Sequence, residues 1–290
     1  MENMVDQSFW KNKKVFITGH SGFKGGWMSI WLNSMGAQVK GYSLEPNTTQ
    51  NFYKIVGIKN LLDSEINDVR DFSKLEDSIN LFKPDIVIHM AAQPLVRSSY
   101  DDPLTTYQTN VIGTANILEI SLKSESVKAV INITTDKCYE NDGRKNGYLE
   151  TDPMGGYDPY SSSKGCAELV TSSFYNSFYK SANKGLCSVR AGNVIGGGDW
   201  AEDRLIPDIL KKFTNKETLF IRNKNATRPW QHVLEPLSGY LILAQNLFKN
   251  PEIFSGGYNF GPLDSDVKNV EWIVNKMSQF FPDSKWKIDD

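Results

Sequence analysis

Three glycines spaced three residues apart, Gly19, Gly22 and Gly25, separate a short apolar run at residues 14–18 from a helical pattern. Glycines in that place permit a tight turn, a close backbone approach to a pyrophosphate and packing of the helix against the strand. The helix N-terminus then directs its free amides and its dipole at the phosphates. The turn therefore predicts a dinucleotide-binding strand–turn–helix unit, although ordinary turn chemistry is also compatible with this spacing.

Tyr160 and Lys164 lie four residues apart in another helical pattern, which places them one turn apart on the same face. The lysine charge favours the tyrosinate, so the phenol can take a proton from a substrate hydroxyl. Lowering its pKa from ~10 to about 7 corresponds to ~4 kcal/mol. A pair of surface residues is the alternative interpretation. Combined with the glycine turn, the pair predicts oxidation of an alcohol by a bound dinucleotide.

Glu45 falls twenty residues after Gly25, where an acid can bind the ribose hydroxyls of the adenosine and disfavour a 2′-phosphate. No arginine follows the second predicted strand directly. The pattern therefore favours NAD over NADP as the cofactor. Ser43 is the alternative contact, in which case Glu45 is only a solvated side chain.

Apolar strands alternate with helical segments up to about residue 190. Strands are predicted at residues 14–18, 38–42, 61–66, 86–89, 129–133 and 186–189. Helices are predicted from an Asp71 N-cap to Phe82, at 104–122 and at 161–179. Such strands form a parallel sheet with both faces covered. The sequence thus predicts an α/β fold, a Rossmann-like doubly wound parallel sheet with a smaller C-terminal substrate-binding lobe.

The residues after Arg190 are richer in Arg, Trp and Pro. We predict that residues 1–190 form the NAD-binding Rossmann domain, which carries the catalytic residues, and that residues 191–290 form the substrate-binding lobe. Some segments of the second part are expected to return to the first domain. Its predicted elements are helices at 204–213 and 237–248 and strands at 219–221 and 258–260. The cleft between two such lobes is the expected ligand site.

The composition excludes several classes of function. A net charge of −2 over 290 residues gives no reason to expect nucleic-acid binding. No apolar stretch approaches the roughly 20 residues of a membrane span, and the polar first ten residues lack a signal-peptide core. The cysteines and histidines show no metal-ligand spacing, so no metal site is expected. Three reduced cysteines in a cytoplasmic protein are the favoured interpretation.

Several segments resemble the extended short-chain dehydrogenase/reductases: the glycine turn, Asn67-Asp68-Val69, Ala91-Ala92-Gln93, Asn110, and Tyr160 with Lys164. Other segments resemble the CDP-glucose 4,6-dehydratase branch of that family, and the resemblance runs from about Phe9 to the end. These segments are 18–25, 93–97, 135–140, 158–165, 191–200 and 228–233.

The resemblance implies CDP-glucose as a small-molecule substrate and a homodimer or dimer of dimers, in which residues 104–122 and 161–179 pair across a two-fold axis. Relatives continue for several dozen residues beyond position 290. The smaller lobe is therefore expected to be incomplete, which bears on the stability and activity of the chain.

The activity implied by the resemblance is that of a hydro-lyase, which converts CDP-D-glucose to CDP-4-dehydro-6-deoxy-D-glucose. Tyr160 with Lys164 would deprotonate the C4 hydroxyl, and Thr135 would hydrogen-bond the C4 oxygen. Asp136 would protonate the departing C6 oxygen, which requires a raised pKa. Lys137 would be either the C5 base or a cation that stabilises the enolate.

The resemblance also implies the binding residues. The implied cofactor-binding residues are Gly19, Gly22, Phe23, Lys24, Gly25, Ser43, Glu45, Asp68, Val69, Ala91, Ala92, Tyr160 and Lys164. The implied substrate-binding residues are Gln93, Arg97, Asn193, Arg204, Arg222 and Arg228, since arginine forks suit phosphate oxygens.

Three alternative functions remain open from the sequence. The first is dehydration of another nucleotide sugar, because the contacts that select the base cannot be placed. The second is 4-epimerisation, which needs Tyr160 and NAD but not Asp136 and Lys137. The third is a non-catalytic NAD-binding protein, which the presence of Thr135, Tyr160 and Lys164 disfavours.

Overall fold

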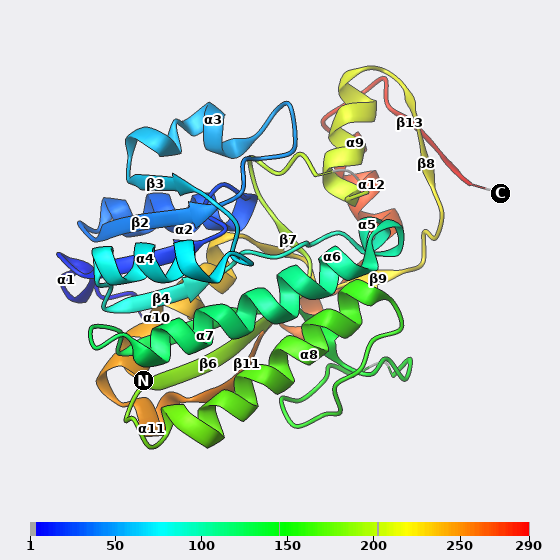
Figure 1. Ribbon diagram of the computed structural model, residues 1–290. Helices are drawn as coiled ribbons and strands as arrows, with labels where there is room; N and C mark the ends of the chain where they lie inside the picture. The colour runs from blue at the N-terminus through cyan, green and yellow to red at the C-terminus, as the bar shows by residue number, and fades with distance from the viewer. Residues whose placement is uncertain (1–3, 145, 202, 290) are drawn as a thin grey trace.

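The structure is a computed structural model that describes residues 4–144, 146–201 and 203–289 (Figure 1). Its centre is a seven-stranded parallel sheet with the strand order β11-β6-β5-β4-β1-β2-β3. The strands are β1 (Lys14–Thr18), β2 (Gln38–Ser43), β3 (Asp63–Ile66), β4 (Ile86–His89), β5 (Ala129–Ile133), β6 (Gly185–Ala191) and β11 (Gly256–Phe260). The predicted Rossmann-like doubly wound fold is confirmed.

Helices cover both faces of this sheet, as Figure 1 shows. One face packs on α2 (Phe23–Ser34) and α10 (Leu234–Lys249), and the other on α4 (Phe72–Phe82), α7 (Gly113–Lys123) and α8 (Pro159–Phe174). Successive residues of β1 serve the two cores: Val15 and Ile17 join the first, and Phe16 joins the second. Asp71 caps α4 as predicted, because its carboxylate accepts a hydrogen bond from the Lys74 amide.

The two long helices predicted at 104–122 and 161–179 each contain a π-helical turn, which interrupts the first helix and ends the second. The first consists of α6 (Pro103–Tyr107), the π-turn Gln108–Ile112 and α7, and the second consists of α8 and the π-turn Tyr175–Tyr179. The first π-turn contains Asn110, whose buried side chain bonds to groups outside its own helix. π-helical turns are frequent at functional sites. The periodicity of apolar residues in the sequence did not predict them.

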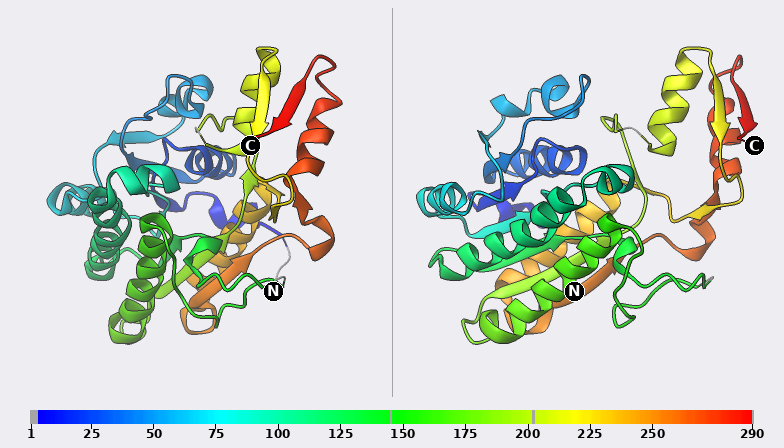
Figure 2. Two further views of the ribbon diagram at one scale, coloured as in Figure 1. Left: turned by 90° about the vertical axis from the view of Figure 1, so that its right-hand side faces the viewer. Right: turned by 45° about the vertical axis from the view of Figure 1, so that its right-hand side comes forward.

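The second part of the chain contributes both to the main sheet and to a separate lobe. β11 pairs with β6, and α10 packs against the sheet, so these segments return to the first domain. The lobe contains α9 (Leu205–Thr214), β8 (Thr218–Ile221), α12 (Val270–Ser278) and β13 (Lys285–Ile288), which enclose a core of their own. Figure 2 shows this lobe standing beside one end of the sheet. A domain boundary at residue 190 stays a prediction.

The remaining elements are short and connect these layers. They are α1 (Gln7–Trp10), α3 (Phe52–Val56), α5 (Val96–Asp101), β7 (Val194–Ile195), β9 (Thr227–Arg228), β10 (Gln231–His232), α11 (Pro251–Phe254), β12 (Lys268–Asn269) and the 3₁₀ turns Ile58–Asn60, Asp136–Cys138 and Asp264–Asp266. Among the helices of the described residues, none combines the length and the apolar character needed to cross a membrane.

Candidate active site

The glycine turn lies tightly against the loop that follows β4. Gly19 has a φ of +78°, and a Cβ there would stand 2.7 Å from the Ala91 amide nitrogen. A Cβ on Gly25 would stand 2.1 Å from the Gly19 carbonyl oxygen. Gly22 caps α2 without a side-chain hydrogen bond, which leaves the first amides of the helix free. Free amides and close backbone packing of this kind suit a pyrophosphate, and its contact with this turn stays a prediction.

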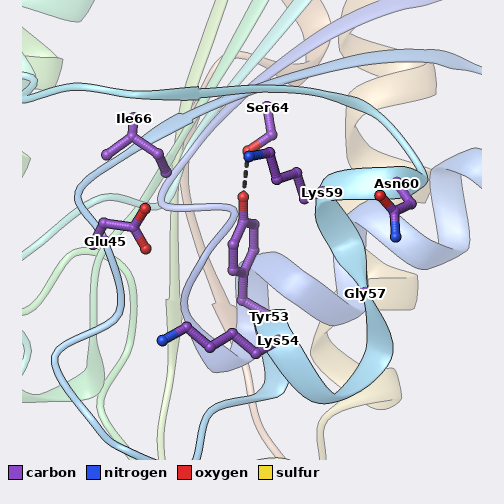
Figure 3. Close-up of a pocket in the computed structure, with 8 residues that line it drawn as sticks. All are labelled: Glu45, Tyr53, Lys54, Gly57, Lys59, Asn60, Ser64 and Ile66. Atoms are coloured by element: carbon purple, nitrogen blue, oxygen red, sulfur yellow. Dashed lines mark hydrogen bonds between the residues drawn. The ribbon is translucent and has the colours of Figure 1, made fainter.

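Glu45 and Ser43, the two alternatives for the adenosine ribose, differ in their surroundings. The Ser43 hydroxyl is buried, accepts from the Ser21 amide at 3.3 Å and contacts the His20 ring at 3.1 Å. Glu45 is exposed and lines a cavity of about 400 Å³ between β3 and α3 (Figure 3). Lys54 lines the same cavity. Because its carboxylate is accessible, Glu45 is the better candidate for ribose hydroxyls.

The other residues implied for the cofactor lie around the same turn. Phe23 opens α2 and is partly buried, and Val69 is buried after β3. Asp68 is committed to Arg70, whose amide and Nε each donate to its carboxylate at 2.9 Å. That bond holds the pKa of Asp68 below its usual value. Ala91 and Ala92 are half-buried in the loop after β4.

Gln93 shapes the loop after β4 from within. Its side-chain amide donates to the Leu95 carbonyl and to the Thr106 hydroxyl, both at 3.0 Å, and its oxygen accepts from the Leu95 amide at 2.6 Å. The Gln93 backbone amide donates to the side-chain oxygen of Asn110 at 2.8 Å. The Asn110 side-chain nitrogen in turn donates to the Ser163 hydroxyl of α8 at 2.8 Å. Gln93 therefore fixes the loop to α8, and its predicted substrate contact stays a prediction.

The predicted catalytic residues come together where β5 ends beside the start of α8. Pro159 and the Asp158 cap begin the helix, which presents Tyr160 and Lys164 on one buried face. The Lys164 ammonium donates to the Ile133 carbonyl at 3.1 Å. The Lys137 ammonium lies 5.8 Å from the centre of the Tyr160 ring.

Thr135 and Asp136 complete this cluster at the end of β5. The Thr135 hydroxyl donates to the Asp136 carboxylate at 3.1 Å and interacts with Tyr160. Both residues belong to the tight turn that joins β5 to the loop beyond it. The cluster thus presents a phenol, a carboxyl and two amines from two adjacent elements.

Burial dominates the ionisation of Asp136 and Tyr160. It raises the pKa of Asp136, against the opposing charges of Lys137, Lys24 and Arg228. It also raises the pKa of Tyr160 to about 12. The expectation that the Tyr160 pKa falls to about 7 is therefore wrong for the polypeptide by itself. The cause is that loss of hydration outweighs the favourable interactions of the phenol, while Lys164 is bonded to a backbone carbonyl.

Lys24 brings an additional cation into this cluster from the glycine turn. Loss of hydration and the charge of Arg204 lower its pKa to about 8, opposed by Asp136. Burial and the charge of Lys24 lower the pKa of Lys164 to about 8 as well. The sequence motif placed Lys24 near the cofactor, but its proximity to Asp136 depends on the fold.

The candidate substrate residues lie on the segments between the sheet and the lobe. Arg97 pairs with Asp203 at 2.9 Å, and Arg204 pairs with Asp199 at 2.8 Å. Arg228 is exposed, and its charge lowers the pKa of Asp136 against the effect of burial. The Asn193 carbonyl accepts a hydrogen bond from the Gln231 backbone amide at 3.1 Å. Arg222 is exposed directly after β8. No recorded contact links Arg222 to the described catalytic groups, so the fold gives it the least support.

Sequence reasoning missed a buried ion pair behind the catalytic cluster. Glu168 and Arg190 bond at 2.7 Å and are each at most 5% exposed. Glu168 follows Lys164 by one helical turn, and this spacing was the only signal in the sequence.

Fold and site together place the chain in the short-chain dehydrogenase/reductase class. The sequence profile of the family described as GDP-mannose 4,6 dehydratase matches residues 16–257. The chain belongs to this family, and the resemblance noted in its sequence is confirmed.

The sequence comparison includes a near relative and a distant one. The chain is 58% identical to the CDP-glucose 4,6-dehydratase of Salmonella typhimurium, over 99% of this chain and 81% of that protein. It is 28% identical to the dTDP-D-glucose 4,6-dehydratase of Dictyostelium discoideum, over 89% of this chain and 60% of that protein.

Solved structures share the fold at lower identity. The UDP-glucose 4-epimerase of Thermotoga maritima superposes with a TM-score of 0.81 at 20% identity, covering 96% of this chain and 86% of that one. The dTDP-glucose 4,6-dehydratase of Bacillus anthracis, solved in complex with NAD, superposes with a TM-score of 0.77 at 19% identity, covering 96% and 85%. At such identities the likeness establishes the fold alone.

Proposed function

We propose that the protein is an NAD-dependent hydro-lyase that converts CDP-D-glucose to CDP-4-dehydro-6-deoxy-D-glucose. The observation that carries the proposal is the cluster of Thr135, Asp136, Lys137, Tyr160 and Lys164 beside a glycine turn that fits a dinucleotide. The 58% identity to the Salmonella enzyme supports CDP-glucose as the nucleotide sugar.

Tyr160 is the base for the C4 hydroxyl in this proposal, and Thr135 binds the C4 oxygen. When bound, NAD would supply redox-neutral hydride exchange between C4 and C6, so the reaction needs no outside oxidant. Lys164 bonds to the end of β5 through the Ile133 carbonyl, and we propose that its positive charge favours the tyrosinate. These two residues are also the proposed neighbours of the cofactor ribose.

Asp136 and Lys137 carry the elimination of water. Once C4 is a ketone, the C5 hydrogen is acidic, and Lys137 either removes this proton or stabilises the resulting enolate. C5 regains one proton when C6 is reduced, so the net loss from the sugar is one water. Asp136 gives its proton to the C6 oxygen as the C6–O bond breaks, and water leaves. Burial raises the Asp136 pKa, which suits a group that must carry a proton near neutral pH.

The diphosphate of the substrate meets arginines at the lobe. Arg228 and Arg204 both influence the ionisation of catalytic groups, so they are the first candidates for its charge. Arg97, Asn193, Gln93 and Arg222 complete the proposed set. The lobe that carries part of this set belongs to the proposed substrate-binding part, residues 191–290.

A 4-epimerase on the same scaffold is the second candidate function. The structural likeness to the Thermotoga epimerase favours it, but only at the level of the fold. An epimerase has no step that requires an acid for C6, whereas Asp136 lies bonded to Thr135 inside the cluster. Dehydration therefore accounts for more of the site.

Incubation with CDP-, dTDP-, GDP- and UDP-glucose in the presence of NAD tests the function. We expect CDP-glucose to give a product lighter by one water, with no net reduced nicotinamide. Formation of CDP-galactose would instead identify an epimerase. Binding of NAD without turnover of any of the four sugars would identify a non-catalytic protein. Preference for another base would overturn the assignment of CDP.

We further propose a homodimer, or a dimer of dimers, built on α7 and α8. Four apolar side chains on or beside these helices are exposed, which suits burial by a second copy. They are Leu104, Ile112, Leu169 and Phe178. Sedimentation equilibrium should give a mass of two or four chains, and Leu169→Glu with Phe178→Glu should lower it. A monomeric parent protein would contradict the proposal.

The cellular location proposed from the composition is the cytoplasm. Cys138, Cys166 and Cys187 are all free in the structure, which suits a reducing compartment.

A further inference from the structure

The segment that carries Thr135, Asp136 and Lys137 is held at both of its ends by one buried ion pair. The Glu168 carboxylate accepts from the Arg190 guanidinium through both oxygens, at 2.9 and 2.7 Å. Such a two-pronged pair has a fixed geometry, unlike a single contact between flexible chains. Glu168 acts on one group assigned to the chemistry, because its charge raises the pKa of Lys164 against the effect of burial, but the mechanism above gives neither residue a role.

Glu168 holds the beginning of the segment. One of its carboxylate oxygens accepts a short hydrogen bond from the Thr134 hydroxyl, directly before Thr135. The other accepts from Ser188 of β6 at 2.5 Å. Tyr160, Lys164 and Glu168 follow one another at intervals of four residues on one face of α8. This face therefore bonds to the end of β5 and to the residues after it, through Thr135, the Ile133 carbonyl and Thr134 respectively.

Arg190 holds the end of the segment. Its Nη1 donates to the Tyr139 hydroxyl at 2.5 Å, and that hydroxyl donates to Asn259 of β11 at 2.7 Å. The guanidinium also lies 5.1 Å from the centre of the Tyr139 ring. Tyr139 is 3% exposed and directly follows the 3₁₀ turn Asp136–Cys138, which we call the catalytic turn. Tyr139 therefore stands at the end of this turn.

The neighbouring backbone leaves room for this arrangement. A Cβ on Gly257 of β11 would stand 2.4 Å from the Arg190 Nη2, and a Cβ on Gly165 of α8 would stand 2.9 Å from the Gly155 carbonyl oxygen. The Gly155 amide donates to the Cys138 carbonyl at 2.8 Å. The absence of a side chain at Gly165 thus permits close packing of the Gly155 backbone on α8, and its absence at Gly257 leaves space for the Arg190 guanidinium.

We propose that Glu168, Arg190 and the Tyr139 hydroxyl are positioning groups for the elimination of water, and we call them the Glu168–Arg190 clamp. The clamp fixes Thr134 and Tyr139, and through them it sets Asp136 and Lys137 relative to C5 and C6 of the sugar. Tyr160 and Lys164 stand on α8 itself, so oxidation of C4 depends on the clamp only through Thr135 and through the charge of Glu168 near Lys164. Both groups of the elimination lie on the held turn, so we expect elimination to depend on the clamp more. This inference rests on the dehydration proposed above.

Two variants that each remove one hydroxyl test the clamp. Thr134→Val deletes the bond to Glu168, and Tyr139→Phe deletes the bond to Arg190 while keeping the ring. Tyr148→Phe is the matched control, because Tyr148 stacks on Tyr139 at 5.0 Å. Among the described residues, its hydroxyl bonds to Asn141 and Asp142, which are both exposed. A double variant combines Thr134→Val with Tyr139→Phe, so that both bonds to the ion pair are lost in one protein.

We expect both single variants to lower kcat roughly 10- to 100-fold, because a small displacement of Asp136 and Lys137 from C6 and C5 slows the elimination. The KM for CDP-glucose should stay nearly unchanged. Reduced nicotinamide should accumulate in a single turnover, since oxidation proceeds and elimination lags. The double variant should be little worse than either single one. In the protein without substrate, hydrogen exchange at the amides of residues 134–139 should be faster in both variants and unchanged in Tyr148→Phe.

Three results would overturn the clamp: turnover like that of the parent enzyme in either variant, equal loss of oxidation and elimination, or unchanged exchange at residues 134–139. Failure of the proposed function is distinguishable, because it is seen in the parent protein when CDP-glucose gives no dehydrated product. Hydrogen exchange alone would then decide whether the clamp holds the turn.

Discussion

Tyr160→Phe is expected to lower the turnover of CDP-glucose by at least 10²–10⁴-fold, the contribution typical of a general base. The phenol is the proposed acceptor of the C4 proton, and it is 8% exposed, so a base from bulk solvent has little access to the same position. The variant keeps the ring and its packing, and the glycine turn is untouched. NAD binding by calorimetry should therefore stay within a few-fold of the parent value.

Tyr157→Phe is the matched control, since Tyr157 is 90% exposed three residues before Tyr160. It should turn over like the parent enzyme. Near-normal turnover in Tyr160→Phe would show that another group takes the C4 proton. Loss of NAD binding in that variant would assign Tyr160 to cofactor affinity instead.

Asp136→Asn is expected to stop the reaction after oxidation. The amide has the shape of the carboxyl but no proton for the C6 oxygen, while Tyr160 and Lys164 remain intact. Enzyme mixed with CDP-glucose and NAD should therefore accumulate bound reduced nicotinamide in a single turnover, visible by its absorbance. Release of dehydrated product should fall by ~10²–10⁴-fold.

Lys137→Met separates the two roles left open for that lysine. If the amine is the C5 base, exchange of the C5 proton with deuterated solvent should slow by a similar ~10²–10⁴-fold. If the amine only stabilises the enolate as a cation, Lys137→Arg should restore exchange that Lys137→Met loses.

Glu140→Gln is the control for these changes, because Glu140 is an exposed acid just beyond the catalytic turn. Its oxidation and elimination should match those of the parent. Should Asp136→Asn form no reduced nicotinamide, or Lys137→Met leave C5 exchange unchanged, the elimination assigned to this pair would be wrong.

The sequence by itself determined the sheet and the parts of the site that depend on local spacing. Apolar runs located β1, β4 and β5 at the residues observed, because a strand buried on both faces is apolar throughout. The glycine turn was predictable because a Cβ at Gly19 or Gly25 would collide with backbone atoms. The pairing of Tyr160 with Lys164 followed from helical periodicity alone.

Only the tertiary structure decided the electrostatics of the site. The Tyr160 pKa was predicted to fall and is raised, because hydration lost on burial outweighs the favourable interactions of the phenol. Lys24 is close to Asp136 because the α2 turn and the end of β5 meet at one edge of the sheet. Neither fact can be derived from the spacing of residues in the sequence.

The tertiary structure also revealed the groups that hold the site in place. The π-turn at Asn110 and the ion pair of Glu168 with Arg190 join residues from different strands and helices. Such contacts depend on the sheet order β6-β5-β4, which brings the end of β6 beside the end of β5 and under α8. Local periodicity predicts which face of an element is buried, whereas the partner buried against that face is set by the assembly of the whole fold.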